Sequence, residues 1–336
     1  MEMEKRKISS KFRLLYLYTL LMEGKILEKD ALASHANCTG RSVERDFEDI
    51  RHFLEEFSVR DSGVVSPELI YSRAKRVYKL EPPMRNLMSS EEIYAVLKIL
   101  LESRAFSKKE LDPIIDKIIN CCVSKDEVKN IRAFIGNERL GYKELQHKKP
   151  LLRRIWELSA AVKEHKFVML EYTRAEGKSV SRKVRPVGLM FSEFYFYLLA
   201  FIDTAHMDDT DIDEEEKKKI KSNPIPTVYR VDRIDSCEVT GEHFKVDYQT
   251  RFEESWYRDR TLYMQSSELE RIEFFYTGKN IDLVLDKLPT AEIIRKTKEG
   301  YLFKADLFGR GFDIWAQAQN GCVKVKKRRT IKYNFK

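Results

Sequence analysis

Residues 39–47 have the sequence Thr-Gly-Arg-Ser-Val-Glu-Arg-Asp-Phe, and this stretch decides how the first part of the chain folds. Thr39 is a good N-cap residue, so a helix is expected to begin here. Apolar residues then recur at steps of four and three and give this helix one buried face, which consists of Val43, Phe47, Ile50, Leu54 and Phe57. The opposite face points outward and carries Arg41, Arg45, Glu48 and His52. The stretch therefore predicts an amphipathic helix with arginines on its exposed N-terminal turns.

The sequence around this helix predicts a first domain at residues 1–82 that contains three helices and a hairpin. Gly24 ends the first helix, and Pro82-Pro83 ends the domain. The predicted elements are helices at about 14–22 and 29–36, the helix that follows Thr39, and extended pieces near 58–65 and 69–80. The last extended piece contains the basic tip Arg73-Ala74-Lys75-Arg76.

A second region, residues 83–147, is predicted to be an all-helical linker. Ser89 and Glu92 form a capping box at its start. Stripes of apolar residues at helical spacing follow; they lie at about 93–101, 114–119 and 128–135.

The rest of the chain differs in composition, because β-branched and aromatic residues alternate with turn residues. Residues 148–250 predict one helix and a small β domain, with the helix at about 150–163 and strands at about 167–172, 181–187, 194–201 and 227–239. The polar stretch 203–223 is expected to be a solvated loop. Residues 251–336 alternate strand-like and helix-like runs and predict an α+β module. The predicted fold class is therefore α+β and multidomain.

Composition excludes several classes of protein. Hydrophobic residues make up 43% of the chain, but the longest apolar run, residues 194–202, is too short to cross a membrane. The five cysteines are odd in number and scattered, which favours a reducing, cytoplasmic location. No phosphate-loop, dinucleotide, hydrolase or zinc-protease motif occurs, and the six histidines are dispersed. We therefore expect no enzyme, no catalytic or metal-binding residue and no cofactor.

The net charge of +8 is unevenly distributed. Residues 321–336 hold seven lysines and arginines and no acid, so a nucleic-acid surface elsewhere requires local segregation of charge. The helix that follows Thr39 suits the major groove of DNA, and the hairpin tip suits the backbone or the minor groove. The predicted DNA-binding residues are Thr39, Arg41, Ser42, Arg45, Arg73, Lys75 and Arg76. Alternatively, the arginines of the helix are surface ion-pair partners of the acids among them, which are Glu44, Asp46, Glu48 and Asp49.

Residues 39–47 resemble the recognition helix of winged helix-turn-helix transcriptional regulators. Ser42 stands where their pattern has threonine, and Phe47 stands where it has isoleucine. The stretch Tyr78-Lys79-Leu80 resembles the end of their wing.

The β domain resembles the WYL domain, which follows such units in bacterial regulators. Arg182 precedes Pro186 by four residues, as in the WYL pattern. The signature Trp-Tyr-Leu triplet reads Phe196-Tyr197-Leu198, and the later run reads Tyr229-Arg230-Val231-Asp232-Arg233-Ile234. Phenylalanine in place of tryptophan keeps the aromatic face and loses the indole N–H.

The resemblance implies an Sm-like β-barrel with a basic ligand pocket, followed by a C-terminal extension that is similar to a ferredoxin-like fold and helps dimerisation. The arginines offer forked anion donors, and Tyr197 can stack on a base. The predicted ligand-binding residues are Arg182, Arg185, Tyr197, Arg230 and Arg233. Alternatively, Asp232 pairs with Arg230 or Arg182, and Phe196 and Leu198 belong to the core. Strand alternation places Tyr197 on the other face.

The sequence thus predicts a bacterial, cytoplasmic, homodimeric and ligand-responsive transcriptional regulator. Its partners would be a double-stranded DNA operator and a nucleic-acid or nucleotide effector, with no membrane. The alternative function is a protein that binds RNA or single-stranded nucleic acid through the Sm-like barrel and the basic tail.

Overall fold

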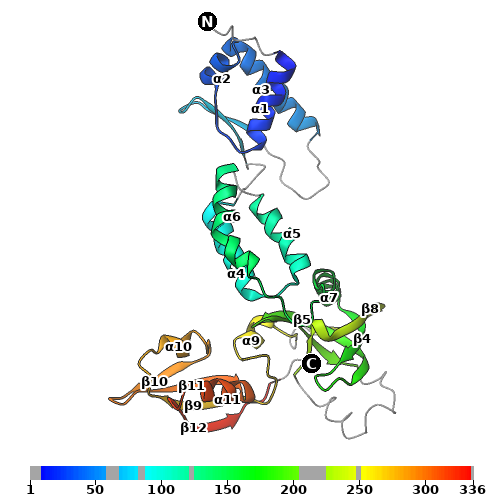
Figure 1. Cartoon of the computed structure of the whole chain (residues 1–336), viewed down its shortest axis with the longest axis vertical. Helices are drawn as coiled ribbons and strands as arrows, with labels where there is room; N and C mark the ends of the chain where they lie inside the picture. Colours follow the sequence, from blue (N-terminus) through cyan, green and yellow to red (C-terminus); the bar gives the residue numbers. More distant parts are fainter. Residues whose placement is uncertain are drawn as a thin grey trace. The chain divides into compact units, whose positions relative to one another are not determined.

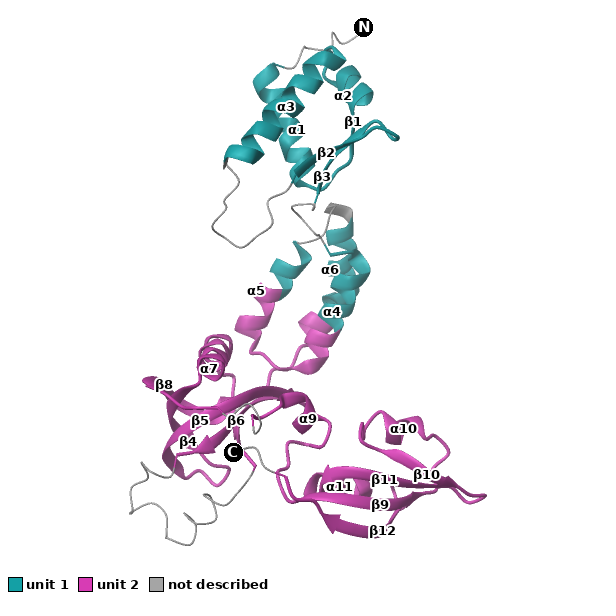
Figure 2. Ribbon diagram, turned by 180° about the vertical axis from the view of Figure 1, so that it is seen from behind, with its two compact units in different colours: residues 1–98, 115–137 teal, residues 99–114, 138–336 magenta. Residues whose placement is uncertain are grey.

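The computed structural model describes residues 9–57, 68–81, 88–120, 125–203, 225–246 and 251–333 (Figure 1). The fold is mixed α+β with three antiparallel sheets, which confirms the coarse class expected from the sequence. The chain forms two compact units, one of residues 1–98 and 115–137 and one of residues 99–114 and 138–336 (Figure 2). The division between them falls inside the region predicted as a helical linker.

The first unit begins with three helices and a three-stranded sheet. Its elements are α1 (Ser10–Met22), β1 (Leu27–Glu28), α2 (Lys29–His35), α3 (Gly40–Phe57), β2 (Glu68–Ser72) and β3 (Val77–Glu81), with the sheet order β1-β3-β2. Thr39 caps α3 as predicted, because its Oγ1 accepts a hydrogen bond from Ser42 N at 3.3 Å. Gly24 follows α1 with a φ of 78°, which confirms that it ends this helix. The extended piece expected near 58–65 lies outside the described residues.

The predicted apolar face of α3 forms the core beneath these elements. Four of its predicted members, Val43, Phe47, Ile50 and Leu54, are buried, while the side chain of the fifth, Phe57, lies outside the described part. The core also includes leucines of α1 and of the β2–β3 hairpin. The Phe47 ring stacks on that of Tyr78 in β3, with 3.8 Å between centroids. This stacking holds the hairpin against α3.

A buried ion pair joins α1 to α3. Arg13 is 7% exposed and Asp46 is 4% exposed. Arg13 donates from Nε and Nη2 to the two carboxylate oxygens of Asp46, and the Nη2 bond is 3.0 Å long. Buried charges are tolerated when they are paired and hydrogen-bonded. Asp46 is therefore a structural residue of α3.

Three helices occupy the region predicted to be helical: α4 (Ser90–Ser103), α5 (Lys108–Ile119) and α6 (Lys125–Leu140). The capping box of α4 is confirmed, because Ser89 N donates to Glu92 Oε2 at 2.7 Å and Glu92 N donates to Ser89 Oγ at 3.2 Å. Their apolar stripes are buried at Ile93, Leu97, Leu101, Leu111, Ile115, Ile119, Ile131 and Ile135.

The second unit contains a five-stranded sheet with a helix on one face. Its elements are α7 (Leu152–Glu164), β4 (Lys166–Thr173), β5 (Ser179–Ser192), β6 (Tyr195–Ile202), β7 (Thr227–Arg230) and β8 (Ile234–His243), in the order β7-β6-β5-β4-β8. Leu158 and Ala161 of α7 belong to the same core as Leu170, Val184 and Leu198 of the sheet. The predicted helix and the first three strands are confirmed. The predicted loop 203–223 lies, apart from its first residue, outside the described part.

The strand expected at 227–239 is wrong as a single element. The 3-10 helix η2 (Val231–Arg233) divides it into β7 and β8. β7 pairs with β6, whereas β8 pairs with β4. The two pieces are thus the opposite edges of one sheet, and a continuous strand could not serve both edges. The turn at η2 carries the chain from one edge to the other.

The last part of the second unit is a four-stranded sheet with helices. Its elements are α9 (Glu254–Arg258), β9 (Leu269–Tyr276), α10 (Asp282–Leu285), β10 (Glu292–Lys296), β11 (Tyr301–Phe308), α11 (Gly309–Ala318) and β12 (Val323–Thr330), in the sheet order β10-β11-β9-β12. Val284 of α10 and Trp315 of α11 share a core with Phe274 and Phe303 of the sheet. Residues Val323–Thr330 of the basic stretch form the edge strand β12.

Loss of the Arg13–Asp46 pair should destabilise the first unit. Asp46→Asn leaves a buried guanidinium without its counter-charge, so we expect a loss of about 3 kcal/mol in the free energy of unfolding. Thermal unfolding followed by circular dichroism measures this loss. The matched control is Glu23→Gln, which breaks the exposed pair of Glu23 and Lys25. Equal effects of the two substitutions would contradict a structural role for Asp46.

Candidate nucleic-acid interface and anion site

The N-terminal turns of α3 present a polar, cationic surface. Arg41, Arg45 and Thr39 are exposed, and Ser42 is half-buried. The hydroxyls of Thr39 and Ser42 lie 3.0 Å apart. The cap therefore orders both hydroxyls beside the two arginines, on the face that the sequence predicts to point outward.

Two of the four acids that stand among these arginines in the sequence are engaged elsewhere. Glu44 forms an ion pair with Lys29 of α2, and Asp46 pairs with Arg13. Neither Arg41 nor Arg45 forms an ion pair with any residue that the structure describes. Glu44 and Asp46 are therefore not ion-pair partners of Arg41 or Arg45, which was the alternative to DNA binding for these arginines. Both guanidinium groups therefore keep their donors for a ligand.

The turn between β2 and β3 carries a second group of cations. Arg73, Lys75 and Arg76 are all exposed, and none of them forms an ion pair with a described residue. Arg76 has a φ of 53°, which reverses the chain at the tip. The tip and α3 share one core through the stacking of Phe47 on Tyr78. The seven predicted DNA-binding residues thus lie on two elements of a single packed unit.

In the second unit, part of the predicted ligand set comes together at the junction of β6 and β7. Tyr197 of β6 and Arg230 of β7 are register partners. The guanidinium of Arg230 lies over the ring of Tyr195, 3.5 Å from its centroid. The pKa of Tyr197 is raised, because the effect of burial is larger than the opposing effect of the nearby charges of Arg230 and Arg233. The three residues Tyr197, Arg230 and Arg233 therefore share one environment.

Arg230 is already paired with a carboxylate, that of Asp232 in the turn η2. Arg230 donates from Nε to Asp232 Oδ1 at 3.1 Å and from Nη2 to Asp232 Oδ2 at 2.7 Å. Asp232 is 5% exposed. This is one of the two pairings considered as an alternative to a free arginine. Arg233 is half-buried and forms no ion pair with a described residue. An anion that reaches the site meets Arg233 and the remaining donors of Arg230.

The other two predicted arginines have their contacts elsewhere. Arg182 is buried and donates to the carbonyl oxygen of Ser181 at 2.7 Å. It is close enough to buried Tyr229 for its charge to lower the pKa of that phenol, which burial raises. Arg185 lies over the ring of Phe201, 5.5 Å from its centroid. Ser181 O and the ring of Phe201 are thus partners of these two arginines outside the Arg230–Asp232 pair.

Strand alternation in β6 follows the expectation from the sequence. Leu198 is fully buried in the core beneath α7, and Phe196 packs against that core. Tyr197 packs instead with Leu199 against the cluster on the other side, which contains Tyr257 and Phe308. Tyr195 was missed by the sequence reasoning, although it lies two residues before Tyr197 on the same face.

His147 also lies in this environment and could not be found from the sequence. The charges of Asp232 and Arg230 both act on it. Its Nδ1 accepts a hydrogen bond from Lys149 N at 3.0 Å, so Nε2 carries the proton of the neutral ring. Nε2 is buried and has no hydrogen-bond partner among the described residues. A buried N–H donor without an acceptor destabilises the folded state, and a bound anion could accept its hydrogen bond.

Helical residues of the second unit touch the same domain. The rings of Phe106 and Phe196 are 5.6 Å apart. Glu110 of α5 accepts hydrogen bonds from Leu151 N and Leu152 N at 2.8 and 2.9 Å, which caps α7. Residues around the start of α5, inside the predicted linker, are therefore attached to the β domain.

Metal sites and membrane spans are both lacking in the described residues. No group of three or more histidine, cysteine, aspartate or glutamate side chains in them could hold a metal ion. None of the described helices is long and apolar enough to cross a membrane.

Comparison with known proteins identifies the β domain. Residues 155–239 match the family model of the WYL domain. This part of the chain is a WYL domain. The match runs from α7 into β8, so it includes Tyr195, Tyr197, Arg230 and Asp232, and it confirms the resemblance seen in the sequence. No curated protein shows a significant match to the chain.

Two solved structures resemble the chain distantly. Proteasome accessory factor B/C (PafBC) of Arthrobacter aurescens aligns with 95% of this chain and 44% of its own length, at 15% identity and a TM-score of 0.27. A CRISPR Cas-related protein aligns with 63% of this chain and 56% of its own length, at 12% identity and a TM-score of 0.34. The chain thus spans less than half the length of the first and less than two thirds of the second.

The state of His147 should make the stability of the second unit pH-dependent. Burial lowers the pKa of His147, so the folded state binds fewer protons than the unfolded chain in acid. The free energy of unfolding should therefore fall as the pH drops through about 6.5. In His147→Gln this fall should be smaller.

Tryptophan fluorescence during urea unfolding at pH 7.5, 6.5 and 5.5 measures this effect. All three tryptophans of the chain, Trp156, Trp256 and Trp315, lie in the second unit. The matched control is His243→Gln, which replaces an exposed histidine of the same unit. If the wild type and His147→Gln lose stability equally between these pH values, His147 does not titrate with folding.

Proposed function

We propose that the protein is a DNA-binding transcriptional regulator whose WYL domain senses a nucleic-acid or nucleotide-like anion. The observation that carries the proposal is the unpaired set of cations on α3 and on the hairpin tip. Arg41 and Arg45 are exposed on one element, and Arg73, Lys75 and Arg76 are exposed on the other, while Glu44 and Asp46 are engaged by other partners. The proposal contains no catalytic step.

The first unit is proposed to act as a winged helix-turn-helix. The order α1-β1-α2-α3-β2-β3 and the sheet order β1-β3-β2 support this assignment. In such a unit α3 enters the major groove, where arginines reach guanine edges and phosphates, and the hairpin tip lies on the backbone or in the minor groove. The Phe47–Tyr78 stacking would hold the two reading elements in a fixed relation.

The WYL domain is proposed to be an Sm-like barrel, and the C-terminal part a ferredoxin-like module that helps the chain to dimerise. The barrel is supported by the turn η2, which joins the two edge strands of the five-stranded sheet. The module is supported by its element order β9-α10-β10-β11-α11-β12 and by the strand order β10-β11-β9-β12. Two copies related by a two-fold axis would match an inverted-repeat operator.

The anion is proposed to bind beside Arg230, at the cost of its pairing with Asp232. Arg233, the N–H of His147 and the rings of Tyr195 and Tyr197 would supply donors and a stacking surface. The contacts of Phe106 and Glu110 connect this domain to helical residues, so a ligand can bias their placement. It does so only if it binds two arrangements with different affinities.

Replacement of Arg45 should weaken specific duplex binding. Arg45→Ala removes a guanidinium that no described residue pairs, so we expect a loss of about 1–3 kcal/mol and a flatter sequence preference. Selection of bound sequences from random duplex, followed by titration of the enriched site, measures both. The control is Arg132→Ala, which removes an exposed arginine of α6 in the same unit. An unchanged footprint and affinity in Arg45→Ala would overturn the assignment of α3.

Two substitutions at the WYL site should change anion binding in opposite directions. Arg233→Gln removes an unpaired donor and should lower the affinity for a short single-stranded oligonucleotide about tenfold. Asp232→Asn removes the competing charge and should raise that affinity. Fluorescence anisotropy measures both affinities. The two substitutions are made in a chain that also carries Arg41→Ala and Arg45→Ala, so that α3 does not contribute to oligonucleotide binding.

The matched control for these two substitutions is Arg153→Gln, which removes an exposed arginine of α7. Circular dichroism establishes that each variant is folded. If Asp232→Asn and Arg233→Gln bind the oligonucleotide as the control does, the anion site lies elsewhere and the sensor proposal fails, while the assignment of α3 stands.

A second candidate function is binding of RNA or single-stranded nucleic acid by the C-terminal part. The strand β12 favours it, because Lys324, Lys326, Lys327 and Arg329 are exposed and form no ion pair with a described residue. Arg328 differs, since it pairs with Asp313 and Glu270. Competition decides between the two functions: single strands that displace a selected duplex from the chain would favour the second.

A further inference from the structure

The side of α7 that points away from the core of the WYL domain is apolar. Leu158 and Ala161 of this helix are buried in that core. Because a helix turns by about 100° per residue, Leu152, Trp156 and Ala160 lie on the opposite side of α7. Surface helices normally carry polar residues there. These three residues are called the outward stripe below.

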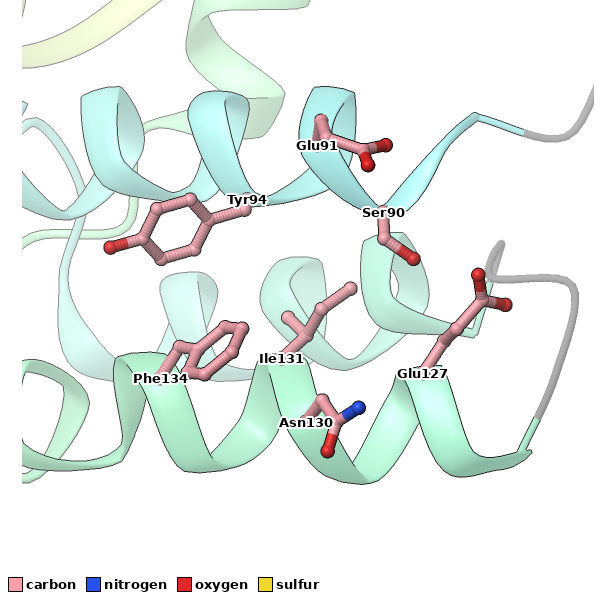
Figure 3. Close-up of a pocket in the computed structure, with 7 residues that line it drawn as sticks. All are labelled: Ser90, Glu91, Tyr94, Glu127, Asn130, Ile131 and Phe134. Atoms are coloured by element: carbon pink, nitrogen blue, oxygen red, sulfur yellow. The ribbon is translucent and has the colours of Figure 1, made fainter.

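Trp156 is the largest residue of the outward stripe. It is 78% exposed, and its ring contacts no aromatic ring or cation of the described residues. Phe134 of α6, in contrast, meets Tyr94 of α4 edge to face, with 5.8 Å between ring centroids, in a pocket between these two helices (Figure 3). Tryptophan is enriched among the residues that dominate binding at protein interfaces. Single exposed apolar residues are common, however, so the case for an interface depends on what surrounds Trp156.

We propose that α7 packs in an antiparallel arrangement against α7 of a second copy of the chain. A two-fold axis beside Leu158 places each residue opposite the one that lies equally far on the other side of position 158. Trp156 of each copy then faces Ala160 of the other. The largest side chain of the outward stripe thus meets the smallest, which lets the two helix surfaces interdigitate.

The charges beside the outward stripe match in the same arrangement. Arg153 and Glu164 lie on one flank of α7, nearly equally far from Leu158, and their side chains are 92% and 51% exposed. In the antiparallel pair, Arg153 of each copy lies beside Glu164 of the other, at both ends of the contact. On the other flank, the apolar stem of Lys163 lies over Leu152 of the second copy.

These charges set the direction of the helices more than the strength of the contact. In its own chain Arg153 pairs with Glu157 at 2.7 Å, and Glu164 pairs with Lys166 at 2.6 Å. Exposed ion pairs contribute little energy, so Arg153→Gln should leave self-association nearly unchanged. A parallel arrangement would put Trp156 against Trp156 and Arg153 against Arg153, which is unfavourable in size and in charge.

This contact goes beyond the proposed function, in which the C-terminal module joins two copies of the chain. It does not depend on DNA or anion binding, because none of its residues belongs to either proposed site. The match favours a second copy over an unrelated protein, because α7 itself supplies both members of each facing pair.

Cross-linking of the full chain with a short bis-maleimide tests whether two α7 helices meet. Ser159 is half-buried and lies next to position 158, so Ser159→Cys places two thiols close together across the axis. Dimer linked through residue 159, identified by mass spectrometry of the linked peptides, should be at least about tenfold more abundant than dimer linked through Glu176→Cys, an exposed control position of the same domain. Absence of this excess would overturn the proposal. If the chain still sediments as a dimer in that case, dimerisation through the C-terminal module stands.

Exchange of the two facing residues tests the register. Trp156→Ala should lower the yield of the Ser159→Cys cross-link about tenfold, because the anchor is lost. Ala160→Trp should lower it as well, because two indoles then collide. The double variant Trp156→Ala, Ala160→Trp should restore the yield, because each new tryptophan faces an alanine.

The matched control for this exchange is Phe134→Ala, which removes a 64% exposed ring from the other unit and should leave the yield unchanged. Circular dichroism checks that each variant is folded. If Ala160→Trp does not fold, the comparison of Trp156→Ala with Phe134→Ala decides. Equal yields in these two variants, or no recovery in a folded double variant, would overturn the proposal.

Discussion

The pairing of Arg230 with Asp232 across one turn of 3-10 helix is the interaction on which the WYL domain depends. The turn carries the chain from β7 to β8, which are the two edges of the same sheet. Asp232 is buried, so its charge must be matched inside the protein, and Arg230 matches it with two hydrogen bonds. The same pairing holds the guanidinium over Tyr195. The residues that join the edges of the sheet are therefore also the residues of the proposed anion site.

This shared role gives a ligand a way to influence more than its own contacts. A ligand of the proposed site that competed with Asp232 would alter the turn between β7 and β8. The charges of Asp232 and Arg230 also act on His147, which lies in a segment predicted as linker. The Phe106–Phe196 contact and the cap that Glu110 provides for α7 tie further helical residues to the domain. A two-state response requires that these contacts differ between the states.

Sequence patterns predicted those features that local periodicity and capping control. The buried face of α3, the cap at Thr39 and the capping box at Ser89 follow from spacing alone, and the structure has all three. Strand β10 was not predicted, because its five residues are exposed and show no alternation of burial. The 3-10 turn and His147 depend on which distant strands and segments meet, and a single sequence does not contain that information. The position of Tyr195 on the same strand face as Tyr197, in contrast, could have been predicted, because the two residues are separated by two positions.

The net charge of a stretch predicts a binding surface less well than does the question of which of its charged side chains are engaged in ion pairs within the protein. The stretch after residue 321 holds most of the excess charge, yet Val323–Thr330 of it is an edge strand, a position where lysines also disfavour pairing with other chains. Arg41 and Arg45 stand among acids and remain available, because Lys29 and Arg13 engage two of those acids. At the WYL site the guanidinium of Arg230 is already taken by Asp232. An anion there competes with an internal carboxylate at high effective concentration, so a ligand with several phosphates, which also reaches Arg233, has the advantage over a single anion.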